Sequence, residues 1–96
     1  MVQIIENWAD IGGTVSGPTL PGTRPDHVGV RIDVDTVEPV EGFPNLLADR
    51  AGQSIDVQIR LDGPLDLRAG QRIGLRARLA APGGAIFADR RTLRLE

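Results

Sequence analysis

The side chains with the clearest chemical potential in this sequence are arginines that fall on one face of predicted strands. Arg76 and Arg78 alternate with apolar residues in one such segment, and Arg60 lies at the end of another. A guanidinium group pairs bidentately with phosphate or carboxylate and also stacks on planar groups. Arginines on an exposed sheet face can therefore bind a strand of nucleic acid. The alternative is an outer surface of arginine–aspartate ion pairs, which we rank slightly ahead.

Aromatic side chains normally add stacking surfaces to such a site, and this chain has one Trp, two Phe and no Tyr. Phe87 alternates with Ile86 and Ala88, which gives it an outward phase, whereas we expect Phe43 to pack in the core or against a loop. Trp8 is a candidate interface residue because tryptophan is enriched at binding hot spots. We rank ahead of this the simpler alternative that Trp8 covers one open end of the fold. The candidate ligand-binding residues are Arg60, Arg76, Arg78 and Phe87.

Two aspartates on the longest predicted strand are the only pattern suggestive of a metal site. Asp33 and Asp35 lie two residues apart and could offer paired carboxylates to magnesium or calcium. Calcium sites need six or more oxygen ligands, and no loop here supplies them in series. We therefore favour ion pairs with arginines such as Arg31 on neighbouring strands, and expect no metal ligands.

The sequence offers no catalytic set. His27 is the only histidine, and a histidine base needs a nucleophile and an orienting partner; we expect a solvated residue at a strand start. Ser16 and Ser54 lack the context of a nucleophile elbow. All eleven basic residues are Arg and there is no Cys, which excludes lysine and thiolate chemistry. We therefore expect no enzyme, no catalytic residue and no cofactor.

Strands with one buried face must position these side chains. In residues 53–61 and 72–79, aliphatic residues alternate with polar or small ones, a period typical of half-buried β-strands. Residues 27–38 form a longer strand of the same kind, and its apolar phase slips by one residue after Val34. A bulge near Asp35 and Thr36 would produce that slip and bend the strand.

The remaining segments complete an all-β chain. Residues 11–15 and 85–96 predict further strands, and glycines in the first of these indicate a bend or bulge. Residues 17–26 read as a long loop that could be mobile or bind a ligand, although a simple solvated loop is the more common outcome. Residues 41–53 break the alternation and predict at most one or two helical turns.

The order of segments resembles the oligonucleotide/oligosaccharide-binding (OB) fold, a five-stranded Greek-key barrel. The resemblance is carried by Ile11-Gly12-Gly13-Thr14-Val15, by the run from Val28 to Val40, and by Leu67-Arg68-Ala69-Gly70-Gln71-Arg72-Ile73. The helix usual between the third and fourth strands is reduced to a turn-rich link. An SH3-like barrel or a small β-sandwich therefore remain the alternatives.

Length and charge set the limits of function. We expect one barrel domain over residues 10–96, preceded by an arm or edge strand over residues 1–9. The net charge of −2 lacks the overall basic excess usual in nucleic-acid binders. No apolar stretch is long enough to span a bilayer and no signal segment is visible. The expectation is a cytoplasmic protein without a membrane partner.

Two functions from different classes follow. The first is a non-catalytic binding module that acts through protein–protein contacts or self-association, which fits the acidic charge, the few aromatics and a free amino-terminal strand. The alternative is a single-stranded nucleic-acid-binding protein of the OB type. A steep loss of affinity with rising salt would mark the second, because phosphate contacts release counterions.

Overall fold

Six β-strands and one 3-10 turn form the regular structure of residues 5–62, 65–80 and 84–96, which the computed structural model describes. The predicted all-β class is confirmed. Residues 1–4 of the predicted arm lie outside the described residues, and residues 5–8 form no strand. The elements are β1 (Ala9–Val15), β2 (Leu20–Pro21), β3 (His27–Pro39), η1 (Ala48–Arg50), β4 (Ser54–Arg60), β5 (Arg72–Leu79) and β6 (Ile86–Leu95).

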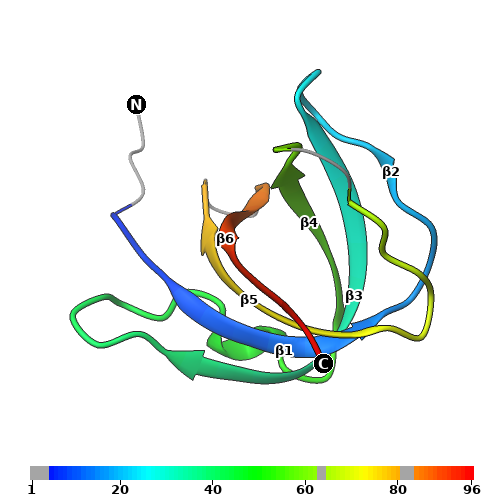
Figure 1. Cartoon of the computed structure of the whole chain (residues 1–96). Helices are drawn as coiled ribbons and strands as arrows, with labels where there is room; N and C mark the ends of the chain where they lie inside the picture. The colour runs from blue at the N-terminus through cyan, green and yellow to red at the C-terminus, as the bar shows by residue number, and fades with distance from the viewer. Residues whose placement is uncertain (1–4, 63–64, 81–83) are drawn as a thin grey trace.

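Five of the strands close into a ring (Figure 1). β1 pairs antiparallel with β3 and β5, β3 with β4, and β5 with β6. A short parallel contact, Val57 to Ile86 and Gln58 to Phe87, joins β4 to β6 and completes the ring. β2 lies outside it on the edge of β3. The predicted small β-barrel is thus confirmed, and β6 separates β4 from β5 although these two are consecutive in the chain.

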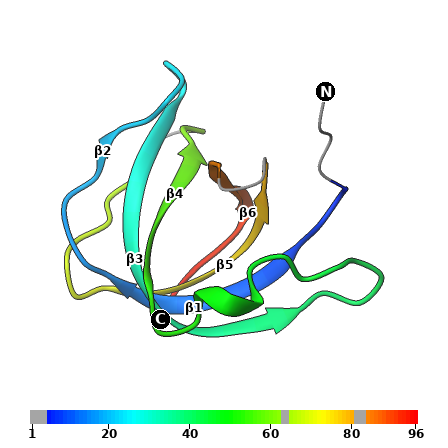
Figure 2. The same ribbon diagram turned by 180° about the vertical axis from the view of Figure 1, so that it is seen from behind.

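A bulge bends β3 so that it pairs with β4 through one half and with β1 through the other (Figure 2). Gly12 lies opposite Thr36 whereas Gly13 lies opposite Val34, which leaves Asp35 as the extra residue. The predicted bulge is therefore confirmed. A Cβ atom on Gly13 would lie 2.3 Å from the Asp33 carbonyl oxygen, so only glycine allows this close approach.

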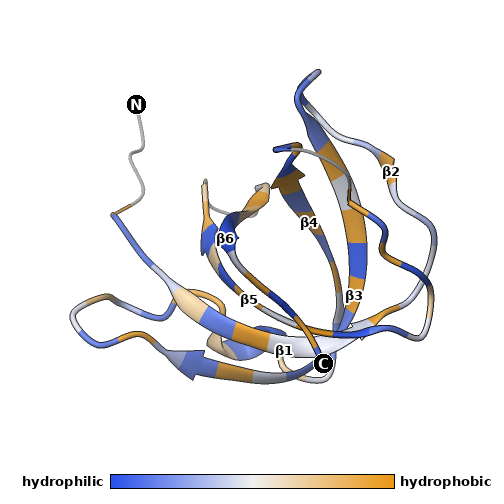
Figure 3. Ribbon diagram, viewed as in Figure 1, coloured by the Kyte–Doolittle hydropathy of each residue, from blue (hydrophilic) through white to orange (hydrophobic). Residues whose placement is uncertain are grey.

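Alternating aliphatic side chains fill the barrel interior, and the hydropathy pattern along the strands is visible in Figure 3. Burial of each such Leu, Ile or Val side chain contributes about 1.5–3 kcal/mol. Leu47, just before η1, is also fully buried and packs in the same core. The single 3-10 turn agrees with the predicted limit of one or two helical turns. Five aliphatic residues of the two alternating segments face inward as predicted and are at most 5% exposed: Ile55, Val57, Ile59, Ile73 and Leu75. Leu61, the last residue of the first alternating segment, is 42% exposed because it lies beyond the end of β4.

Two segments outside the long strands differ in part from what we expected. The 17–26 segment contains β2, a strand of only two residues that is too short to show any alternation. Phe43 is 37% exposed and does not belong to the core cluster, to which this segment contributes Leu46 and Leu47 instead. Of the two positions expected for Phe43, the core is therefore excluded, and packing against a loop stays a prediction.

Candidate functional site

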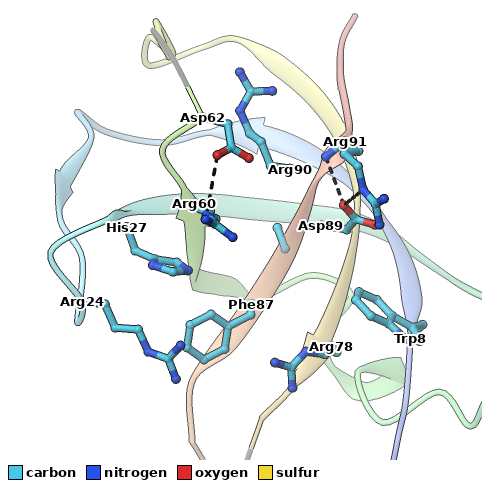
Figure 4. Close-up of a pocket in the computed structure, with 11 residues that line it drawn as sticks. Trp8, Arg24, His27, Arg60, Asp62, Arg78, Phe87, Asp89, Arg90 and Arg91 are labelled. Carbon is cyan, nitrogen blue, oxygen red and sulfur yellow. Dashed lines mark hydrogen bonds and ion pairs between the residues drawn. The ribbon is translucent and has the colours of Figure 1, made fainter.

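A hollow of about 460 Å³ lies where β4 and β5 end and β6 begins, beside the turn between β2 and β3 (Figure 4). Five arginines, two aspartates, one histidine and two aromatic residues line it. The positive charge is local, because the whole chain carries a net charge of −2. The charged and aromatic lining residues are Arg24, Arg60, Arg78, Arg90, Arg91, Asp62, Asp89, His27, Trp8 and Phe87.

Phe87 is the aromatic residue around which two of the arginines gather (Figure 4). The Cζ atom of Arg24 lies 5.1 Å from the centre of the Phe87 ring, and that of Arg78 lies 5.5 Å from it. Cations at such distances are attracted by the electrons of the ring. The ring of His27 approaches edge-on, with centroids 5.6 Å apart. Phe87 therefore lies outside the core, as its phase predicts, but it is half-buried and covered.

The turn between β2 and β3 places Arg24. The Gly22 amide donates to the His27 carbonyl oxygen, and the His27 amide donates to the Arg24 carbonyl oxygen, both at 3.1 Å. The Thr23 amide also donates to Oε1 of Gln58 on β4, at 2.9 Å. Gln58 is buried, so this bond fixes the turn against the barrel wall.

His27 is not the solvated residue that we expected. Its side chain is 11% exposed, because Phe87 covers the ring and Nδ1 hydrogen-bonds Oδ1 of Asp26 at 2.8 Å. This hydrogen bond lowers the pKa of Asp26 below its ordinary value. The Nε atom of Arg60 lies 4.0 Å from Asp26 and 3.6 Å from Asp62, and its side chain is largely exposed to water.

An irregularity in β6 brings further charges to the hollow. Gly74 pairs with Arg94, but Arg76 pairs with Asp89, so β6 contains extra residues between these two points. The Thr92 hydroxyl bridges the gap: it accepts from the Arg76 amide at 2.8 Å and donates to the Asp89 carbonyl oxygen at 2.7 Å. Irregularities of this kind commonly redirect side chains beside functional sites. Here Asp89, Arg90 and Arg91 all line the hollow.

Arg90 and Arg91, neighbours on β6, differ in their hydrogen-bond partners. Arg91 pairs with Asp89 through two bonds of 3.2 and 3.3 Å, which lowers the pKa of Asp89 and raises that of Arg91. The Nε atom of Arg90 is buried and has no hydrogen-bond partner among the described residues.

Arg76 is the one proposed ligand residue that the structure places elsewhere. Its guanidinium forms a fork with Asp10 on β1, with distances of 2.9 and 3.3 Å, which raises the pKa of Arg76. It does not line the hollow. The structure brings the other candidates, Arg60, Arg78, Phe87 and Trp8, together there.

The remaining barrel surface fits the ion-paired alternative. Arg31 forms a fork with Asp56 at 3.0 and 3.2 Å, Arg72 pairs with Asp35, and Asp33 accepts a hydrogen bond from Ser54. Within the described parts of the chain, no three His, Cys, Asp or Glu side chains form a group able to hold a metal ion.

Sequence reasoning missed the other residues of the hollow, among them four basic side chains: Arg24, His27, Arg90 and Arg91. The proline-rich loop that carries Arg24 was recognised as a possible binding loop, but no pattern indicated which loop residue faces the barrel. Arg90 and Arg91 lie in the irregular part of β6, where alternation gives no direction.

Comparison with protein-family models, with curated proteins and with solved structures finds no match to this chain. Among the described residues, no helix is long and apolar enough to cross a membrane. The functional conclusion therefore depends on the chemistry of the hollow. The guanidinium groups beside the aromatic rings of Phe87 and Trp8 suit a ligand that carries both anionic and planar groups.

Proposed function

We propose that this protein is a non-catalytic binding module of the OB type that binds single-stranded nucleic acid through the hollow around Phe87. The observation that carries this proposal is a single hollow in which five arginines, with only two aspartates, lie together with Phe87 and Trp8. Guanidinium groups pair with phosphates, and aromatic rings accept bases, so the two components of a nucleic-acid strand each have a counterpart here.

The strand arrangement supports the OB assignment. The OB fold is a five-stranded Greek-key barrel that binds through its second and third strands and adjoining loops. The second and third strands of the ring in chain order are β3 and β4. Arg24 precedes β3 and Arg60 ends β4, so the hollow borders that region. The alternative of a small β-sandwich is less well supported, because two separate sheets would not form the continuous ring of five paired strands.

Protein–protein contact or self-association is the second candidate. It is favoured by exposed apolar side chains near the strand ends and by the outer edge of β2, which has no partner strand among the described residues. Singly scattered apolar side chains are also common on monomers, which is why we place this role second. Sedimentation at high protein concentration tests it, and a strictly monomeric mass would count against it. The exposed side chains are Ile5, Leu20, Leu61 and Leu95.

The proposed function is tested by titrating labelled single-stranded DNA and RNA with the protein and following fluorescence anisotropy. We expect binding at low salt that weakens steeply as salt is raised, because every phosphate contact releases condensed cations. Unlabelled duplex of the same sequence should compete poorly, since its bases are not available for stacking. Absence of any anisotropy change at low salt would refute the proposal.

A further inference from the structure

A second hollow, of about 290 Å³, adjoins the first. The two share Trp8 and Arg78, and the second is otherwise lined by the amino-terminal segment and by Leu79 at the end of β5. In Figure 4 the Arg78 side chain lies between those of Phe87 and Trp8. The cation is therefore at the boundary between the Phe87 site and a separate, less charged space.

The segment that carries Trp8 is fixed to the barrel although it forms no strand. The Asn7 side chain donates to the Leu79 carbonyl oxygen at 3.0 Å and accepts from the Leu79 amide at 2.8 Å. These two bonds reproduce the exchange that a paired strand residue would make, and Asn7 is only 2% exposed. Trp8 is thus held in place before any ligand arrives.

Trp8 and Phe87 differ in what covers their rings. Phe87 has two guanidinium groups and the edge of His27 against it. Within residues 5–62, 65–80 and 84–96, no guanidinium and no second aromatic ring packs on Trp8. The Trp8 indole nitrogen donates to Glu6 at 3.4 Å, which holds the ring by its edge. A planar ligand therefore meets fewer obstacles at Trp8 than at Phe87.

We propose that a base of the bound strand stacks on Trp8 in the second hollow while the adjoining phosphate pairs with Arg78. Phe87 is then a positioning residue: it holds the guanidinium groups of Arg24 and Arg78 toward the phosphates and stacks no base. This inference rests on the proposed function and assigns the base-stacking role to a residue of the amino-terminal segment.

The test uses Trp8 as its own reporter, because it is the only tryptophan in the chain. The full-length protein is titrated with a short oligothymidylate and, separately, with an abasic sugar–phosphate oligomer of the same length and charge. We expect the oligothymidylate to quench the tryptophan fluorescence and to bind about tenfold more tightly, as one stacked base typically provides. The abasic oligomer should bind without quenching.

Matched variants separate stacking from charge. Trp8→Ala should lose about tenfold in affinity for oligothymidylate and nothing for the abasic oligomer, whose unchanged binding also shows that the variant is folded. Trp8→Phe should retain most of the affinity. Phe87→Leu should weaken both ligands, because Arg24 and Arg78 lose the ring that holds them.

Two results would overturn the inference while the proposed function survives. One is equal affinity for the two oligomers, and the other is an unchanged affinity of Trp8→Ala for oligothymidylate. Binding of neither oligomer at low salt would instead refute the proposed function and the inference with it.

Discussion

Arg76 and Arg78 lie two residues apart on β5 and differ in what they contact. Arg76 meets Asp10 across the sheet, which satisfies its fork, whereas Arg78 lies against the Phe87 ring. Among the described residues, Arg78 has no carboxylate partner within ion-pair distance. At the scale of single residues, the neighbour therefore decides whether an arginine is structural or is left free to bind a ligand.

This difference predicts opposite effects of two matched substitutions. Arg78→Ala should weaken binding of single-stranded DNA by about three- to tenfold and leave stability nearly unchanged, because its loss removes a phosphate contact. Arg76→Ala should leave affinity unchanged and lower the free energy of unfolding slightly, because it breaks a partly exposed ion pair with Asp10. Anisotropy titration and urea unfolding measure the two quantities. Equal losses of affinity would contradict the assignment.

The paired carboxylates predict how stability depends on pH. The hydrogen bonds of Arg31 with Asp56, and of Arg91 with Asp89, lower the pKa of each carboxyl below its ordinary value of 3.8. A folded pKa below the unfolded one means that the stabilisation is complete above the unfolded pKa and is lost as pH falls through the folded pKa. The free energy of unfolding should therefore fall as pH is lowered from about 5 to below 3.

Urea unfolding of Asp56→Asn across this range supplies the control. The asparagine cannot titrate, so this variant should be slightly less stable at pH 7 and should lose less stability on acidification. The same steep loss in the variant as in the wild type would show that Asp56 does not contribute to the acid dependence.

At the scale of elements, the bend in β3 determines whether the ring can close. Gly13 lies opposite the bulge and approaches both the Asp33 carbonyl oxygen and the Ile32 side chain. Gly13→Ala should lower the free energy of unfolding by about 2–3 kcal/mol, since the added methyl group forces the backbones apart. Gly17→Ala is the matched control, because a Cβ atom there meets no other atom within 4 Å. Thermal unfolding of both variants would test this, and equal melting temperatures would contradict it.

Period-two alternation was sufficient to predict β3, β4 and β5 within about a residue or two, because each has one face in the core. The slip in phase after Val34 was sufficient to locate the bulge. β2 escaped prediction because two residues have no period. The course of β6 between Asp89 and Leu93 depends on hydrogen bonds of Thr92 to partners on two strands, and no local pattern encodes them.

The candidate site was predictable only in part for a related reason. Phases along single strands put Arg60, Arg78 and Phe87 on outward faces, which the structure brings together in one hollow. The same reasoning included Arg76, because the alternation along one strand does not show which residue lies opposite on the neighbouring strand. In the structure that residue is Asp10, which pairs with Arg76. Arg24 was missed because its position depends on Gln58, a residue distant in sequence that holds the turn.

At the scale of the whole molecule, the charge distribution is uneven. The chain carries a net charge of −2, and elsewhere on the barrel arginines such as Arg31 and Arg72 are paired with aspartates. The hollow instead collects five arginines against two aspartates. We therefore assign the attraction for a polyanion to this hollow and not to the net charge of the protein.

The most direct measurement of that claim compares two double variants of identical net charge in titrations with single-stranded DNA over a range of salt concentrations. Arg60→Ala/Arg78→Ala removes two arginines of the hollow, and Arg31→Ala/Arg68→Ala removes two arginines outside it. We predict that the first loses at least about tenfold in affinity and that its salt slope falls by about 2, whereas the second stays close to the wild type. Equal losses in the two variants, or no binding by the wild-type protein, would contradict the account.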